Sequence, residues 1–158
     1  MSFTHLDSSG HARMVDVTAK QPTVRSATAR GFVRCTPEVV ASLRDGIVPK
    51  GDVLAVARIA GIQGAKRCAE LLPLAHIIGV HGASVDLAIE DGGVAIEATV
   101  RTADRTGVEM EALTAVSVAA LAIVDMVKGL DKSSSIENVR IIAKEGGRSG
   151  SWKRPGEE

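Results

Sequence analysis

The chain has 158 residues, a length typical of a single domain with its own buried core. Nineteen basic and nineteen acidic side chains cancel, and this zero net charge excludes an overall field that would attract nucleic acid or an anionic membrane. Hydrophobic residues make up 45% of the chain but aromatic residues only 2%, so the core must consist of Ala, Val, Leu and Ile, and oligomerisation would bury more apolar area.

Four strands are predicted from the pattern of apolar residues, over residues 24–34, 80–89, 94–100 and 139–144. Three helices are predicted between them, over residues 37–46, 53–72 and 107–128. The second and third strands are joined by Glu90-Asp91-Gly92-Gly93, a sequence typical of a hairpin turn.

Capping residues predict where the helices begin and end. Thr36 is a good N-cap, and Pro37 suits the first helical turn. We expect Asp52 to cap the second helix and Pro73 to end it. Thr106 and Glu109 have the spacing of a capping box, which predicts that the third helix begins directly after Thr106.

The order of elements is a strand, a helical region in two pieces, two strands, a helix and a strand. This order predicts an α+β fold of the ferredoxin-like, split βαβ kind, a mainly antiparallel sheet with helices on one face. We expect one domain over residues 1–158, with mobile ends at 1–11 and 145–158. RNA binding is disfavoured, because we expect no aromatic side chains on the sheet and the chain has no basic excess.

The cysteines and histidines indicate neither a disulfide framework nor a metal site. Cys35 and Cys68 form no CxxC pair, and the four histidines share no metal-ligand spacing. We find no apolar signal-peptide core and no run long enough to span a bilayer. We therefore expect a cytoplasmic protein without membrane contact, metal or cofactor.

The third helix is unusual because residues 112–124 contain no charge. A helix that is apolar all round is buried all round. In a fold with helices on one face of a sheet, the outer side of this helix would normally face water. We therefore expect another subunit to cover it.

Charged residues lie at the two ends of this helix. Glu109 is explained by the capping box, and Glu111 by the favourable position of a carboxylate in a first helical turn. Asp125 lies at the unfavourable end of the helix dipole. A structural ion pair with Lys128 at i+3 is one explanation, and an acid–base pair used in catalysis is the other.

Three further features have both a structural and a functional interpretation. Gly61 and Gly64 each cost a helix about 1 kcal/mol, which makes sense if a backbone or a ligand comes close. Lys50 is an ordinary exposed lysine or a site residue, and His76 a satisfied core histidine or a catalyst. The glycines and cations of residues 144–150 suit a phosphate group or a flexible tail.

Taken together, these motifs resemble the cyclic pyranopterin monophosphate synthase family over about residues 4–152. The segments that carry the resemblance are Met14-Val15-Asp16-Val17, Lys50-Gly51-Asp52, Ala57 to Ile62, Leu74 to His76, the ten residues Thr106 to Ala115, Asp125-Met126 with Lys128, and Gly146 to Gly150. The segment from Thr106 is far more specific than a short motif.

The resemblance implies an enzyme that converts 3′,8-cyclo-7,8-dihydro-GTP into cyclic pyranopterin monophosphate and pyrophosphate in molybdenum cofactor biosynthesis. It implies a homohexamer of three dimers with sites at subunit interfaces. It implies that Asp125 is catalytic, together with Lys50 and Lys128. The substrate contacts that it implies are Leu74, Ala75, His76, Met110 and Glu111, with Arg25, Lys66 and Arg148 on the triphosphate. Asp, Lys and His suit the proton transfers, and cations suit the departure of pyrophosphate.

The chain departs from the family pattern at two places. Ala75-His76-Ile77-Ile78 stands where the family usually has Cys-His-Pro-Leu, and Val124 and Val127 stand where it usually has Tyr and Cys. A paralogue that binds a nucleotide or pterin with weak turnover is therefore the alternative, and a non-catalytic regulatory module is a further one. Glu111 and Asp125 are 14 residues apart, about 21 Å along a helix, so we expect each site to combine Glu111 of one subunit with Asp125 of its neighbour.

Overall fold

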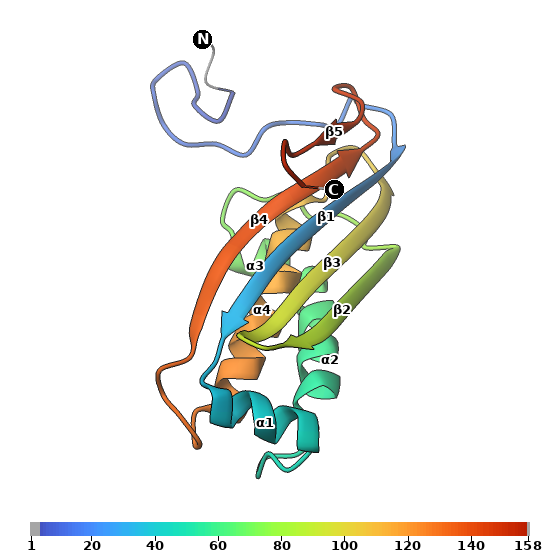
Figure 1. Ribbon diagram of the computed structural model, residues 1–158. Coiled ribbons are helices and arrows are strands. Elements are labelled where there is room, and N and C mark those ends of the chain that lie inside the picture. Colours follow the sequence, from blue (N-terminus) through green and yellow to red (C-terminus); the bar gives the residue numbers. More distant parts are fainter. Residues whose placement is uncertain (1–3, 158) are drawn as a thin grey trace.

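The computed structural model describes residues 4–157, which form one antiparallel sheet with helices on one of its faces (Figure 1). The elements are β1 (Thr23–Arg34), α1 (Pro37–Asp45), α2 (Val53–Lys66), α3 (Cys68–Leu71), β2 (Gly82–Glu90), β3 (Gly93–Asp104), α4 (Glu109–Val127), β4 (Ser135–Glu145) and β5 (Trp152–Lys153). The order of strands across the sheet is β2-β3-β1-β4-β5, and every pairing is antiparallel. The ferredoxin-like, split βαβ fold predicted from the sequence is confirmed.

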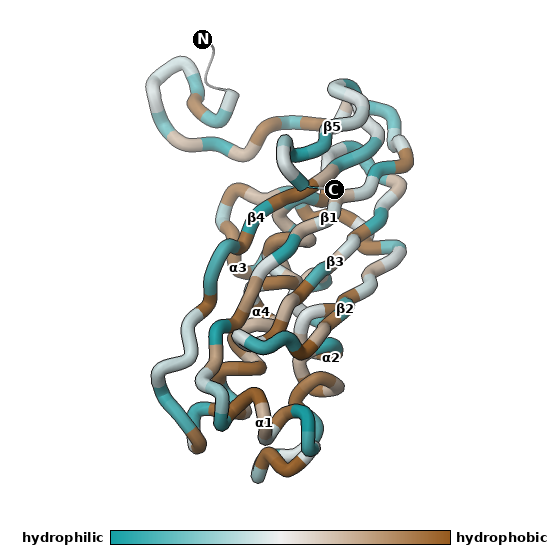
Figure 2. Tube along the Cα trace, viewed as in Figure 1, coloured by the Kyte–Doolittle hydropathy of each residue, from teal (hydrophilic) through white to brown (hydrophobic). Residues whose placement is uncertain are grey.

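The core lies between the sheet and the pair α2 and α4. Figure 2 shows α4 behind the sheet as a largely apolar segment. The side chains buried in this layer are small or β-branched: Ala27, Ala29 and Val33 of β1, Val94, Ile96, Ala98 and Val100 of β3, and Ala112, Ala115, Val116, Ala119 and Ile123 of α4. A core without aromatic residues therefore closes because its two layers come very near to each other.

The helices α2 and α4 are antiparallel and in close contact. Gly61 of α2 lies against Ala115 and Ala119, whereas Cys68, after the end of α2, lies beside Thr114. A Cβ atom on Gly61 would lie 2.9 Å from the backbone oxygen of Ala115, closer than side chains tolerate. The expectation that a backbone comes close is confirmed for Gly61, whereas a Cβ atom on Gly64 would meet the side chain of Val118.

Three helix boundaries test the capping predictions. The Thr36 and Asp52 side chains each accept a bond from the backbone N–H three residues on, as predicted. The capping box at Thr106 is wrong, because α4 has Val108 as its N-cap and no side-chain capping bond. The Val108 side chain is fully buried, so packing in the core fixes the start of this helix in place of a hydroxyl cap.

The second predicted helix is two helices in the structure. The chain leaves helical geometry at Arg67, whose φ is −111°, and α3 then runs from Cys68 to Leu71. β4 begins at Ser135, earlier than predicted, and contains a bulge beside Asn138, which has φ 60°. The pairing of β5 with β4 was not predicted. Beyond it, the Glu157 carboxylate contacts the guanidinium groups of Arg30 and Arg140.

The helix α4 is long and apolar enough to cross a membrane by length and composition alone. The sequence-based statement that no run approaches this length is therefore wrong. In the folded chain, half of this helix is buried against the sheet and α2, so its apolar character is explained by its place in the core. Its outer side remains exposed at Leu121, which keeps 58% of its surface.

The close approach at Gly61 generates a prediction about stability. Gly61→Ala should lower the free energy of unfolding by about 1 to 3 kcal/mol, because the added methyl group meets the Ala115 backbone, which cannot rotate away. Urea unfolding at matched chain concentration measures the change. Gly129→Ala is the control, since no atom lies within 4 Å of its Cβ position, and it should change stability by less than about 0.5 kcal/mol. An unchanged Gly61→Ala variant would contradict this account of the packing.

Candidate active site

The predicted catalytic residues meet at the C-terminal end of α4. The Nζ atom of Lys128 lies 2.7 Å from one Asp125 carboxylate oxygen, and the Nζ atom of Lys50 lies 3.2 Å from the other. Lys50 also donates to the Asp125 backbone oxygen at 2.9 Å. These three residues, hereafter the lysine–aspartate cluster, are brought together because antiparallel packing places the start of α2 beside the end of α4.

The lysine–aspartate cluster is exposed and ionised. Lys128 and Lys50 hold the pKa of Asp125 below its ordinary value through hydrogen bonds and charge. All three side chains keep 46% to 57% of their surface. Exposed ion pairs of this kind contribute little to stability. The cluster therefore presents an anionic acceptor between two ammonium donors, an arrangement suited to proton transfer and to binding an anion.

A second group of predicted site residues lies at the other end of α4, around the loop of residues 72–81. The His76 ring nitrogen Nε2 is 2.5 Å from the backbone oxygen of Val15. His76, Arg105 and residues 14–18 line a cavity of about 540 Å³. Leu74 is exposed and Ala75 half-buried in the same loop, as is expected of residues that contact a ligand.

Glu111 is a buried carboxyl group beside this loop and is only 5% exposed. Burial raises its pKa, and the nearby Glu109 charge acts in the same direction, while backbone and Cys68 hydrogen bonds and His76 oppose the shift. Cys68 in turn accepts a hydrogen bond from Thr114 at 3.5 Å. A carboxyl group whose pKa is raised by burial can hold or release a proton nearer to neutral pH than an exposed one.

The predicted triphosphate contacts do not form one cluster. Arg25 is half-buried in β1 and donates to the backbone oxygen of Arg105 at 3.5 Å, beside the cavity that contains His76. Arg148 is exposed in the turn after β4. Lys66 is exposed at the end of α2, in a shallow groove lined by Ile59 and Ile62. Met110 is 43% exposed at the start of α4.

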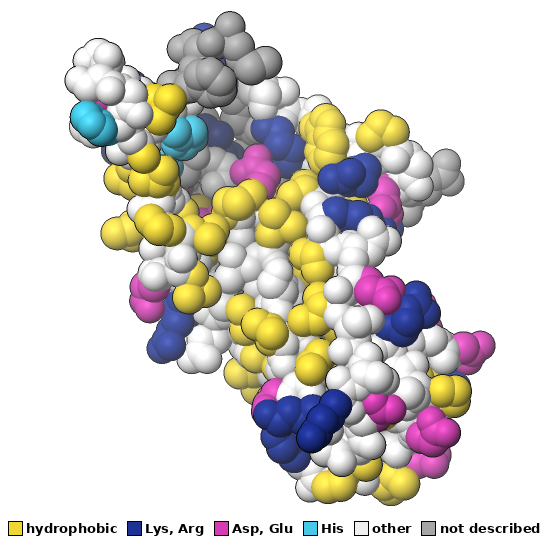
Figure 3. Space-filling model, turned by 90° about the vertical axis from the view of Figure 1, so that its left-hand side faces the viewer, with side chains coloured by type: hydrophobic (Ala, Val, Ile, Leu, Met, Phe, Trp, Pro, Cys, Tyr) yellow, Lys and Arg dark blue, Asp and Glu magenta, His cyan; other side chains and the backbone are white. Residues whose placement is uncertain are grey.

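The structure separates the predicted site residues into two groups at opposite ends of α4. Asp125 belongs to one end, and Glu111 with His76 belongs to the other, so a single chain does not bring them together. Figure 3 views the molecule from the β4 side and shows hydrophobic side chains gathered along the middle of this face, with charged groups at both ends.

Sequence reasoning missed Arg105 and Cys68 as site residues. Arg105 lines the cavity beside His76, and its Nε atom donates to the backbone oxygen of Lys20 at 2.9 Å. Its position directly before the specific segment at Thr106 was the available signal. Cys68 gave no signal in the sequence, because its contact with Glu111 depends on the packing of two helices.

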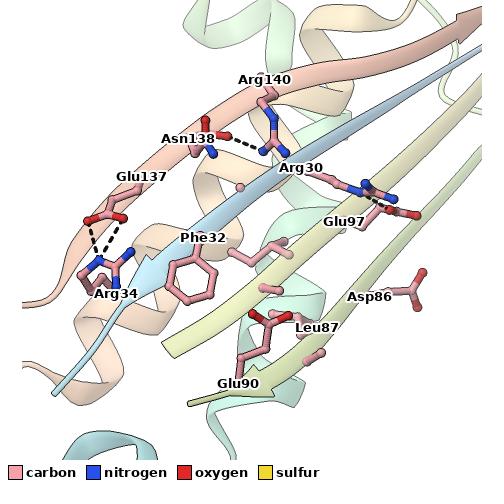
Figure 4. Close-up of a pocket in the computed structure, with 14 residues that line it drawn as sticks. Arg30, Phe32, Arg34, Asp86, Leu87, Glu90, Glu97, Glu137, Asn138 and Arg140 are labelled. Atoms are coloured by element: carbon pink, nitrogen blue, oxygen red, sulfur yellow. Dashed lines mark hydrogen bonds and ion pairs between the residues drawn. The ribbon is translucent and has the colours of Figure 1, made fainter. Parts of the chain in front are cut away.

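Another cavity, of about 630 Å³, lies on the opposite face of the sheet and contains none of the predicted site residues (Figure 4). Its arginines are paired: Arg30 with Glu97 at 2.6 Å and Arg34 with Glu137 at 2.9 Å. Phe32 lies among them, so the expectation of a sheet without aromatic side chains is wrong at this position. We interpret this cavity as a solvated, charge-paired sheet surface, because its cations are already neutralised.

Residues 4–157 contain no group of three or more His, Cys, Asp or Glu side chains that could hold a metal ion.

Comparison with known proteins adds the family. The family model of MoaC matches residues 14–147. A cyclic pyranopterin monophosphate synthase of Chloroflexus aurantiacus is 59% identical over 155 residues, which cover 97% of this chain and 95% of that protein. Synthases of the same name from Streptomyces coelicolor and Geobacter sulfurreducens are 60% and 53% identical, and the matches cover 96% and 98% of this chain and 89% and 98% of the relatives.

The buried Glu111 predicts a pH dependence of stability. The unfolded chain releases this proton near 4.5, the ordinary pKa of a glutamate, whereas the folded chain holds it to higher pH. Below the pKa of the unfolded chain, Glu111 is protonated in both states and does not change the free energy of unfolding. Between the pKa of the unfolded chain and the higher pKa of the folded chain, the free energy of unfolding falls by about 1.4 kcal/mol per pH unit. Glu111→Gln should consequently be more stable than the wild type at about pH 8, and this advantage should shrink toward about pH 4. Thermal unfolding across this range measures it. The exposed Glu90→Gln serves as control, and an advantage independent of pH would contradict the prediction.

Proposed function

This chain belongs to the MoaC family, and on that premise we propose that it converts 3′,8-cyclo-7,8-dihydro-GTP into cyclic pyranopterin monophosphate with release of pyrophosphate, a step of molybdenum cofactor biosynthesis. The observation that carries the proposal is the contact of Lys50 and Lys128 with the two oxygens of the Asp125 carboxylate. The alternative of a regulatory module leaves this cluster unexplained. The name shared by relatives over nearly the full length favours an active enzyme over a weak paralogue.

The reaction needs proton transfers during ring opening and reclosure, and it needs charge stabilisation as pyrophosphate leaves. Asp125 supplies a carboxylate that accepts a proton, and Lys50 and Lys128 keep it ionised. The same two lysines offer positive charge to a developing phosphate oxyanion. No step requires a redox cofactor, and we assign the whole reaction to side chains of this chain.

The residues at the other end of α4 are assigned to substrate binding. His76 lines the cavity, and Leu74 and Ala75 precede it in the same loop. Met110 and Glu111 belong to the first turn of α4, where Met110 is exposed and Glu111 is buried. Arg25, Lys66 and Arg148 are assigned to the triphosphate, because these cations would offset the charge that the substrate brings into the site. Ala75 and Ile77 replace the usual thiol and proline, so the loop must obtain its rigidity from other contacts.

We assign the chain to a homohexamer of three dimers, with each site shared between two subunits. The separation of Asp125 from Glu111 supports the sharing, because an antiparallel partner helix would bring the two ends of α4 together. The exposed apolar residues Ile59 and Leu121, at 68% and 58% exposure, lie on the two helices that such a partner would cover. We assign the enzyme to the cytoplasm, where its small-molecule substrate would reach it.

The cluster predicts the effect of three substitutions. Asp125→Asn, Lys50→Ala and Lys128→Ala should each lower kcat by about 100-fold to 10,000-fold, because each removes a charge that takes part in proton transfer. The fold should survive, since all three side chains are exposed. The measurement is formation of cyclic pyranopterin monophosphate and pyrophosphate from the cyclic precursor. Lys132→Ala, which changes another exposed lysine near the end of α4, should retain full activity. A wild-type chain that is folded and forms no product would favour the weak paralogue instead.

The shared site predicts complementation between two inactive variants. Glu111→Ala and Asp125→Asn, each inactive alone, should regain activity when they are unfolded together, mixed and refolded. In a mixed dimer both lesions fall in one site and the other site is intact. With random pairing about half of the dimers are mixed, so up to about a quarter of wild-type activity should return.

The control for complementation is Asp125→Asn mixed with Lys128→Ala. Asp125 and Lys128 of one chain belong to the same cluster. In a mixed dimer each chain therefore contributes one altered cluster, every site carries a lesion, and activity should stay absent. Mass spectrometry of the intact dimer verifies subunit exchange. Exchange without recovered activity in the Glu111 mixture would contradict a shared site.

A further inference from the structure

The loop that carries His76 has little regular structure of its own. Residues 72–81 connect α3 to β2 and lie outside every helix and strand. The loop is open to solvent in part, and Ile77 keeps 90% of its surface. Because the loop backbone sets where the His76 ring stands, the contacts that hold this loop determine the shape of the cavity.

Two side chains at the end of β3 hold the loop at Gly79, three residues after His76. The Gly79 N–H donates to Oδ2 of Asp104 at 3.0 Å, and the Gly79 carbonyl accepts from the Thr102 hydroxyl at 2.5 Å. Thr102 is 2% exposed, so it is a fixed point of the core. Both backbone polar groups of this one residue are thus bound to β3.

The second Asp104 oxygen binds the backbone of the next residue, Arg105, which lines the cavity. Oδ1 accepts from the backbone N–H of Arg105 at 2.7 Å. Arg105 lines the cavity with His76, and its guanidinium group is anchored on the Lys20 backbone. One carboxylate therefore links the His76 loop to the strand end that presents Arg105, a cation suitable for an anionic substrate.

We propose that Asp104 is a positioning residue, which sets the separation of His76 and Arg105 by binding both the loop and the start of the Arg105 segment. In this arrangement Arg105 is a further cation that faces the phosphate groups of the substrate. The proposal rests on the proposed assignment of substrate to the cavity that contains His76. A carboxylate that only closes a surface turn would stabilise the chain locally and leave the kinetics unchanged.

The ionisation of Asp104 is consistent with this role. The Gly79 N–H and then the Arg105 N–H hold the pKa of its carboxyl group below the ordinary value. The group is thus an acceptor for both N–H groups throughout the neutral range, and an asparagine can replace it in only one of the two bonds.

The test compares Asp104→Ala, Asp104→Asn and a control, Asp86→Ala, which changes an exposed aspartate of β2 on the opposite face of the sheet. Amide hydrogen exchange at Gly79 measures whether its N–H is still bound to residue 104. The values of kcat and KM for the cyclic precursor measure whether the binding groups of the cavity are still in place. Asp104→Ala should expose the Gly79 amide and lower kcat/KM by about 10-fold to 100-fold, the effect of misplaced binding groups. Asp104→Asn should lie between Asp104→Ala and the wild type, and Asp86→Ala should match the wild type in both measurements.

Two results would overturn the proposal. In the first, the Gly79 amide of Asp104→Ala exchanges faster than in the wild type, but kcat/KM stays within about twofold of the wild-type value. Misplaced binding groups would lower kcat/KM by more than this. The other is unchanged exchange at Gly79. His76→Ala separates the premise from the inference, because a fully active His76→Ala would refute the proposed site itself. If Asp104→Ala does not fold, Asp104→Asn decides between the same outcomes.

Discussion

The structure depends on how closely α2 can pack against α4. Gly61 brings the α2 backbone against Ala115, and the small buried side chains of α4 pack against the sheet on the other side. Because the two helices are antiparallel, this one contact fixes both ends of the pair. It places Lys50 beside Asp125 at one end and Cys68 beside Glu111 at the other. The predicted site residues are thus arranged by a packing constraint in a core that has no aromatic side chains.

The carboxyl groups at the two ends of α4 lie in opposite environments, and their pKa values are shifted in opposite directions. Asp125 is exposed between two ammonium groups, which hold its pKa low. Glu111 is buried, and its loss of water raises its pKa. Proton transfer over several steps needs both an acceptor that stays ionised and a donor that keeps its proton. A long apolar helix between them keeps the two environments separate within a chain.

The cavity beside His76 shows how a loop can be made part of a rigid site. Its backbone is bound at Gly79 by Asp104 and Thr102, which belong to a strand of the main sheet. Binding groups that are held by the sheet keep their positions better than groups on a free loop. The larger cavity on the opposite face has more charges, yet Arg30 and Arg34 there are already paired. The pairing of these arginines with carboxylates distinguishes this cavity from the one beside His76 better than the difference in cavity volume does.

Features that depend on near neighbours in the chain could be predicted from the residues alone. Alternation predicted the strands, Thr36 and Asp52 predicted two helix starts, and the i+3 spacing predicted the contact of Lys128 with Asp125. Contacts between distant segments became visible only in the folded chain. Lys50 reaches Asp125 across 75 residues, Asp104 reaches Gly79 across 25, and the burial of Val108 moved the start of α4 away from Thr106. Local spacing fixes which side chains share one turn or face, but only the packing of whole elements fixes what those faces meet.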